Sequence, residues 1–197
     1  MKTELIAEIG QNHNGDLDLA KELIRYAKDS GADVAKFQVY NAKELFDSSE
    51  KNKWFEYNCK TELTRDQIFF LAEYSHKLNI EFMASVFDIE RIEWLEDVGV
   101  KRYKIASRSI YDEQLIKALI ETGKPLIASL GMWEGNKIPN FNSKRAIDYL
   151  HCISKYPTKL EELFIKKIDF KTYSGLSDHT IGITAACSAI VYGAKII

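Results

Sequence analysis

The sequence has no long hydrophobic run and no excess of basic residues. In 197 residues, no apolar stretch approaches the roughly 20 residues that span a bilayer. The N-terminal residues also lack the apolar core of a signal peptide. The formal net charge of −2, from 27 basic and 29 acidic residues, provides no basic face for a phosphate backbone. We therefore expect a cytoplasmic protein that binds neither membranes nor nucleic acid.

Cysteine is also scarce. The three cysteines, Cys59, Cys152 and Cys187, are odd in number and far apart in the sequence. Their spacing favours neither a disulfide framework nor a closed cysteine metal site, so we expect reduced thiols. Nothing in the composition shifts abruptly enough to mark a linker, and the length fits one large domain.

Short apolar runs alternate with segments of helical periodicity along the chain. The predicted strands are residues 5–9, 34–40, 80–87, 100–106, 125–130, 147–152 and 173–177, and an eighth begins at 194–197. The first predicted helix has apolar residues at Leu19, Leu23, Ile24 and Ala27 and is ended by Gly31. The other predicted helices are residues 63–78, 112–122, 159–168 and 181–192, with another starting at Asp88. We expect a polar loop up to Glu62. Because Gly135 and Pro139 interrupt helical periodicity, residues 132–146 are also expected to be mainly loop.

This alternation predicts an α/β fold with a parallel sheet. Polar residues fall at the ends of nearly all the strands, which favours a closed TIM (β/α)8-type barrel over an open sheet with one switch point. They are Glu8, Lys36, Gln38, Ser85, Lys104, Ser107, Ser129, His151, Ser154, Tyr156, Ser177 and His179. The predicted barrel is truncated at the start of its eighth strand.

Two lysines lie within otherwise apolar strands. Lys36 and Gln38 share one strand face by period-2 alternation, and Lys104 repeats the arrangement before Ser107. An ammonium in such a run is paired, points into a polar cavity, or reaches solvent at the strand end. Two lysines surrounded by hydroxyls indicate an anion pocket, for which phosphate is a natural occupant.

The segment 175–180, with sequence GLSDHT, has two interpretations. Ser177 or Asp178 can cap the helix that follows, as such residues commonly do. Capping alone leaves His179 unexplained, so a functional site at this strand end is the other interpretation.

Six motifs carry a family resemblance: AEIGQNHNG at 7–15, KFQ at 36–38, YKIAS at 103–107, LGM at 130–132, LHCISKYPT at 150–158 and GLSDHT at 175–180. In this order and spacing, they resemble the N-acetylneuraminate (sialic acid) synthase family, which includes the pseudaminic and legionaminic acid synthases. The match runs in register from residue 4 to the last residue.

The resemblance implies a barrel that condenses phosphoenolpyruvate with the open-chain aldehyde of an N-acylated amino sugar. It also implies a divalent metal, Mn²⁺ or Mg²⁺, with His179 as a ligand. Glu8 would sit beside the reacting carbons, while Gln38 and Tyr156 would face the sugar. The residues implied to hold phosphoenolpyruvate are Lys36, Ser85, Lys104, Ser107, Ser129 and Ser177, with Ser154 nearby.

The chain departs from the family pattern at three places. Arg108 and Ser109 stand where the family has an acidic segment, and Val86 follows Ser85 where Thr-Pro is usual. The family also continues beyond Ile197 into a second metal-binding histidine, an eighth helix and an antifreeze-like domain that covers the partner's active site in a homodimer. We therefore expect little synthase activity from these 197 residues alone, and open strand edges at the first and seventh strands.

Two other functions fit the same residues. A Schiff-base aldolase would use Lys36 or Lys104 as its nucleophile. A non-catalytic remnant would bind phosphoenolpyruvate or a full-length partner subunit. Among the histidines, His13 either contacts the sugar or stabilises its loop, and His151 is expected to be a hydrogen-bonded core residue.

Overall fold

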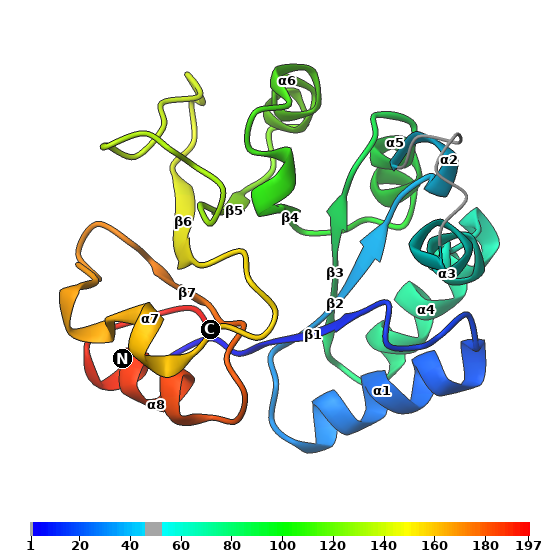
Figure 1. Cartoon of the computed structure of the whole chain (residues 1–197). Coiled ribbons are helices and arrows are strands. Elements are labelled where there is room, and N and C mark those ends of the chain that lie inside the picture. The colour runs from blue at the N-terminus through cyan, green and yellow to red at the C-terminus, as the bar shows by residue number, and fades with distance from the viewer. Residues whose placement is uncertain (1, 46–52) are drawn as a thin grey trace. The chain divides into compact units, whose positions relative to one another are not determined.

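The computed structural model describes residues 2–45 and 53–197 (Figure 1). Its strands are β1 Ile6–Gly10, β2 Val34–Val39, β3 Glu81–Val86, β4 Tyr103–Ile105, β5 Leu126–Ser129, β6 Ile147–Cys152 and β7 Gly175–Ser177. Its α-helices are α1 Leu17–Asp29, α2 Ala42–Leu45, α3 Lys53–Thr61, α4 Arg65–Lys77, α5 Glu90–Asp97, α6 Glu113–Glu121, α7 Leu160–Leu163 and α8 Thr184–Val191. The predicted α/β alternation is confirmed.

The chain forms two compact units. One is Ile6–Tyr103, and the other combines the N-terminal residues up to Leu5 with Lys104–Ile197. No helix in the described part of the chain has both the length and the apolar character that crossing a membrane would require.

In the first unit, β1, β2 and β3 are parallel neighbours in chain order. The register pairs Glu8 with Lys36 and Gln38 with Ser85. Side chains alternate across β2, so Phe37 faces away from Lys36 and stacks on Phe82 with ring centroids 5.5 Å apart. Helices α1 and α4 pack against β2 and β3, which closes an apolar core on one sheet face.

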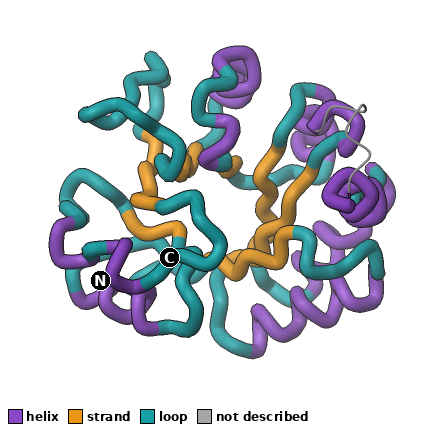
Figure 2. The backbone as a smooth tube through the Cα atoms, viewed as in Figure 1, coloured by secondary structure: helices purple, strands orange, loops and turns teal. Residues whose placement is uncertain are grey.

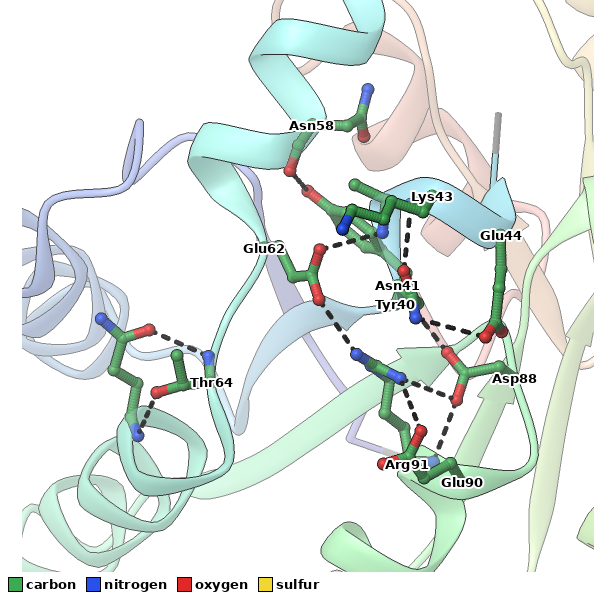
Figure 3. Close-up of polar contacts among 12 residues, drawn as sticks. Tyr40, Asn41, Lys43, Glu44, Asn58, Glu62, Thr64, Asp88, Glu90 and Arg91 are labelled. Atoms are coloured by element: carbon green, nitrogen blue, oxygen red, sulfur yellow. Dashed lines mark hydrogen bonds and ion pairs between the residues drawn. The ribbon is translucent and has the colours of Figure 1, made fainter. Parts of the chain in front are cut away.

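The helices of this unit start where side chains satisfy free backbone amides. The carboxylate of Asp16 accepts hydrogen bonds from the N–H groups of Asp18 and Leu19 at 2.9 and 3.1 Å. Thr64 and Gln67 form a reciprocal capping box at the start of α4 (Figure 3). These caps fix the ends of helices whose apolar faces then pack on the sheet.

Buried polar contacts hold the segment after β2. Gln11 donates to the Tyr40 hydroxyl and to Asn58 Oδ1, at 2.5 and 2.6 Å, and Tyr40 bonds the Thr61 hydroxyl at 2.7 Å. Tyr57 donates to the backbone oxygen of Gln11 at 3.1 Å. These bonds join the loop after β1 to α3.

The prediction of a polar loop up to Glu62 is therefore wrong where the structure describes it. Helices α2 and α3 occupy residues 42–45 and 53–61, and residues 46–52 lie outside the described part. The Asn41 side chain caps the first of these helices by accepting from the N–H of Lys43 at 3.0 Å. Long-range hydrogen bonds, which local composition does not reveal, stabilise α3.

A buried arginine forms ion pairs that link three connecting segments of this unit (Figure 3). Arg91 is only 4% exposed, and its guanidinium lies 3.0 Å from Glu62 and 3.3 Å from Asp88. The same carboxylates accept backbone N–H groups, Glu62 from Ala42 at 3.0 Å and Asp88 from Asn41 at 3.2 Å. One cation therefore fixes the segments that follow β2, α3 and β3.

In the second unit, β4, β5, β6 and β7 follow one another in chain order. The core beneath β7 includes Leu163, Phe170, Leu176, Ala185 and Ala189. Between β5 and β6 the chain forms no helix, as predicted, and Figure 2 shows this connection as loop throughout.

Two predicted helices of this unit are shorter than expected. The helix predicted at 159–168 is the four-residue α7 followed by a 3₁₀ turn, Ile165–Lys167, because Phe164 adopts a left-handed φ of 43° between them. Helix α8 starts at Thr184 rather than 181, since Gly182 has a φ of 86°. A left-handed residue cannot continue a right-handed helix.

The last residues of the chain form backbone hydrogen bonds with β7 and with Glu4. The backbone oxygen of Ile196 accepts from the N–H of Leu176 at 3.0 Å, and Ile197 donates to the oxygen of Glu4 at 3.0 Å. Gly175 permits this approach, because a Cβ there would lie 1.8 Å from the Ile196 oxygen. The predicted eighth strand is thus present as isolated bridges, and the expectation of an open edge at β7 is wrong.

Replacing Arg91 should destabilise the protein strongly. Arg91→Leu leaves the carboxylates of Glu62 and Asp88 without their cation, so we expect a loss of about 3 kcal/mol in the free energy of unfolding. The exposed pair of Arg65 and Asp97, at 2.6 Å, provides the control. Arg65→Leu should cost less than about 1 kcal/mol. Urea unfolding measures both, and equal losses would contradict the role given to Arg91.

Candidate functional site

The first cluster of predicted site residues lies in the unit Ile6–Tyr103. Lys36 is 6% exposed, forms an ion pair with Glu8, and lies 3.4 Å from the Ser85 hydroxyl. The register of β1 on β2 brings Glu8 beside Lys36, so the carboxylate reaches the ammonium across the strand pair. Burial of Lys36 is tolerated because an anion and a hydroxyl satisfy it.

The Glu8 carboxylate is half exposed, which leaves it accessible to a small molecule. Gln38 lies next along the same face of β2. A Cβ at Gly10 would lie 3.1 Å from Glu8 Oε1 and 3.5 Å from Gln38 Nε2, so the backbone passes close to both side chains. The cluster therefore combines a cation, a carboxylate, a hydroxyl and an amide.

The second cluster lies in the unit that contains Lys104–Ile197. Lys104, 4% exposed, donates to the Ser129 hydroxyl and to the backbone oxygen of Ile105, the latter at 3.1 Å. Ser129 is 2% exposed and comes from β5. Both partners accept hydrogen bonds, so the ammonium is held at a defined position.

Three polar side chains converge on Gly131. A Cβ there would lie 2.5 Å from Ser154 Oγ, 2.8 Å from Cys152 Sγ and 3.0 Å from Ser107 Oγ. The N–H of Gly131 donates to Ser107 Oγ at 3.1 Å. The absence of a side chain at Gly131 is therefore what lets these groups gather.

Cys152 connects Ser107 to His179. Its sulfur lies 3.6 Å from Ser107 Oγ and 3.8 Å from His179 Nδ1. Burial raises the pKa of the Cys152 thiol, but hydrogen bonds and charge from His179, Ser107 and Lys104 together outweigh this and leave the pKa below its usual value. Burial lowers the pKa of His179, but contacts with Cys152 and the Ile153 carbonyl produce a net rise.

The remaining predicted residues, Tyr156 and Ser177, contact His179 or pair with Cys152. Tyr156 packs on the His179 imidazole with ring centroids 4.0 Å apart, and Ser177 pairs with Cys152 in the register of β6 and β7. Asp178 accepts from the N–H of Thr180 at 2.9 Å. Asp178 thus forms a local turn, and no side-chain hydrogen bond caps α8, so the cap interpretation of this segment is wrong.

His179 fits the role of a metal ligand in one respect. Its Nδ1 lies 2.7 Å from the Ile153 carbonyl, so Nδ1 carries the proton and Nε2 is left with its lone pair. Within residues 2–45 and 53–197, however, no group of three or more His, Cys, Asp or Glu side chains is placed to hold a metal ion. His179 is therefore not part of such a group in the described residues.

Two other histidines, His13 and His151, pack against aromatic rings. His13 is 1% exposed, and its Nδ1 accepts from the N–H of Gly15 at 3.2 Å, which fits the loop-stabilising interpretation. Its ring also lies near Phe37, on the sheet face opposite Lys36. His151 packs edge-on against Tyr173, but its buried Nδ1 has no hydrogen-bond partner. The predicted hydrogen-bonded core role is therefore wrong for this atom.

Sequence reasoning missed Cys152 and the close approach at Gly131. Side chains alternate along β6, so the sequence could have placed Cys152 on the same buried face as Leu150. Its contacts with Ser107 and His179 depend on side-chain positions from three separate segments.

Comparison with known proteins identifies similar sequences and folds. The NeuB family profile matches residues 23–197. An uncharacterized protein of Methanocaldococcus jannaschii is 38% identical, and the match covers 99% of this chain and 60% of that protein. The N,N'-diacetyllegionaminic acid synthase of Legionella pneumophila is 35% identical, with 98% and 62% covered.

A solved structure shows the same fold. The N-acetylneuraminic acid (sialic acid) synthetase of Leptospira borgpetersenii matches with a TM-score of 0.91 and 34% identity, over 100% of this chain and 72% of that one. The present chain spans about three fifths of the length of the first two relatives.

The burial of His13 should make stability depend on pH. Burial lowers its pKa below the usual 6.5, so the unfolded chain takes up this proton more readily. The contribution of neutral His13 to the free energy of unfolding is fully present above pH 6.5, and it is lost as the pH falls below this value. The slope is at most about 1.4 kcal/mol per pH unit.

Urea unfolding of the wild type and of His13→Gln at pH values from about 5 to about 8 tests this pH dependence of stability. The stability difference between the two proteins should shrink as the pH falls below 6.5. His76→Gln, at an exposed position on α4, is the control for losing a histidine. A difference that stays constant or grows on acidification would refute the assignment.

Proposed function

The chain belongs to the NeuB family, and on that premise we propose that it is the phosphoenolpyruvate-binding part of a sialic-acid-type synthase. The proposed reaction condenses phosphoenolpyruvate with an N-acylated aldose, such as N-acetylmannosamine, to give a nonulosonic acid and phosphate. The observation that carries this proposal is a pair of buried lysines, Lys36 and Lys104, each hydrogen-bonded to a serine hydroxyl.

The two lysine clusters have the chemistry to bind an anion. Phosphoenolpyruvate presents a phosphate and a carboxylate, which ammonium and hydroxyl groups recognise by charge-assisted hydrogen bonds. As the family resemblance implies, we assign two groups of residues to these anionic groups: Lys36 and Ser85 of one unit, and Lys104, Ser107, Ser129 and Ser177 of the other. Ser154, beside Gly131, would extend the same hydroxyl-rich surface.

The sugar would be oriented by side chains near these clusters. Gln38 offers an amide on the same strand face as Lys36, and Tyr156 is largely exposed beside His179. Both can donate and accept hydrogen bonds, as binding a polyhydroxylated substrate requires. Their assignment to the sugar rests on the family resemblance.

The proposed chemistry joins the methylene carbon of phosphoenolpyruvate to the aldehyde carbon of the sugar. Water then adds to the cationic C2 and phosphate leaves. Glu8, half exposed and paired with Lys36, would orient that water or accept its proton. Lys36 and Lys104 would stabilise the negative charge on the departing phosphate.

His179 would hold a divalent metal through Nε2, since its Nδ1 faces the Ile153 carbonyl. Such a metal, when bound, supplies Lewis-acid polarisation of the aldehyde oxygen. Ordering of the imidazole by Tyr156 and Ile153 would keep Nε2 at a fixed position.

The contacts of the lysines favour anion binding over Schiff-base chemistry. A nucleophilic lysine must lose its proton, which an apolar or cationic environment promotes. Lys36 instead faces the Glu8 carboxylate, and Lys104 donates to a hydroxyl and a carbonyl. These acceptors match a protonated ammonium.

Phosphoenolpyruvate should raise the melting temperature of the chain. Lys36→Met and Lys104→Met each remove a charge-assisted hydrogen-bond donor, so each should weaken binding by more than about tenfold. Lys43→Met, an exposed lysine on α2, should leave binding unchanged. The change in melting temperature with phosphoenolpyruvate concentration is measured for the wild type and for the three variants.

Phosphate release in the presence of Mn²⁺, phosphoenolpyruvate and N-acetylmannosamine separates the remaining alternatives. Binding with turnover supports a synthase, and binding without turnover supports a non-catalytic phosphoenolpyruvate-binding chain. An absence of any thermal shift, or an equal shift in the two buried-lysine variants, would refute the assignment of these lysines.

A further inference from the structure

A groove of about 640 Å³ lies beside the connection between β5 and β6. This connection contains no helix, so its irregular chain and the start of α6 together form the walls. The apolar part of the lining includes Ile110, Ile116, Pro139 and Phe141. The volume lies within the range of small-molecule sites.

One wall of the groove is a pair of stacked aromatic rings. Tyr111 and Trp133 have ring centroids 5.3 Å apart and ring planes inclined by 27°. The indole N–H of Trp133 donates to the Lys137 carbonyl at 2.8 Å, and the Tyr111 hydroxyl accepts from the N–H of Glu134 at 2.8 Å. The hydrogen bonds fix both rings before any ligand arrives, which lowers the entropic cost of binding.

The aromatic wall remains accessible. Tyr111 is 55% exposed although it is stacked on Trp133. Its hydroxyl accepts one hydrogen bond and still has a proton to donate. The wall therefore offers both an apolar ring surface and a polar edge to a ligand.

The polar lining is balanced in charge and mixed in hydrogen-bonding character. Glu113 and Lys137 contribute one charge of each sign, and Asn136 and Asn140 contribute amides. The Asn140 oxygen accepts from the N–H of Asn142 at 2.9 Å, which leaves its amide hydrogens for other acceptors. This lining suits a neutral ligand with several hydroxyls better than an anion or a purely apolar chain.

We infer that this groove is a binding site for a neutral saccharide ring. A pyranose has an apolar C–H face that can lie on the aromatic wall and hydroxyl edges that can reach the amides and the two charged side chains. The lining residues lie within 110–116 and 133–141, and none of them is assigned to phosphoenolpyruvate. The inference is therefore independent of the proposed function.

Titration of the ¹⁵N-labelled chain with methyl glucopyranoside and N-acetylglucosamine tests the inference. The indole N–H signal of Trp133, assigned with Trp133→Phe, should shift saturably. The expected dissociation constant is about 1–10 mM, as for a weak ligand of about a dozen non-hydrogen atoms. The indole signals of Trp54 and Trp94 in the same spectrum are the internal reference and should not move.

Tyr111→Leu should weaken the response by more than about tenfold, because it removes half of the aromatic wall. Tyr26→Leu, which removes a half-exposed tyrosine from α1, should leave it unchanged. Asn136→Ala, at an exposed lining position, provides a second variant if Tyr111→Leu does not fold.

Three results would overturn the inference. The first is a Trp133 signal that stays in place up to about 100 mM of either saccharide. The second is an equal shift of all three indole signals. The third is a Trp133 signal that moves with protein concentration alone, which would show that a second copy of the chain covers the groove.

Discussion

The interaction on which the first cluster of candidate site residues depends is the ion pair between Lys36 and Glu8. An ammonium inside an apolar strand is tolerated only where other groups replace its hydration. The parallel register of β1 and β2 provides the Glu8 carboxylate, and β3 adds the Ser85 hydroxyl. Three strands therefore have to be in correct register before this lysine is satisfied, and the same register leaves the Glu8 carboxylate half exposed.

The segments that follow these strands are held by polar contacts rather than by apolar packing alone. Gln11, Tyr40 and Thr61 join the loop after β1 to α3, and Thr61 is followed directly by Glu62, which pairs with Arg91. Buried networks of this kind are costly when a member is missing, because the remaining groups lose their partners. The contacts thus link the positions of neighbouring loops at the C-terminal ends of β2 and β3.

The sequence predicts the elements whose signals are local. Asp112 accepts from the N–H of Leu115 at the start of α6, and alternation correctly places Lys36 and Gln38 on one face of β2. It does not predict α3, because that helix depends on long-range hydrogen bonds. It also does not predict that the helix expected at 159–168 breaks at Phe164, because the break depends on a single left-handed residue. Nor does it predict the contacts of Cys152 with Ser107 and His179, which join segments far apart in the sequence. The catalytic and binding roles of the site residues remain predictions.

The claim that both buried lysines are anion-binding ammonium groups can be tested by chemical trapping. The chain is incubated with pyruvate and sodium borohydride, digested, and searched for reduced adducts by mass spectrometry. A nucleophilic lysine would form an imine that borohydride reduces to a stable secondary amine. Our account predicts no adduct on Lys36 or Lys104. A stable pyruvate adduct on either lysine would contradict it and favour an aldolase.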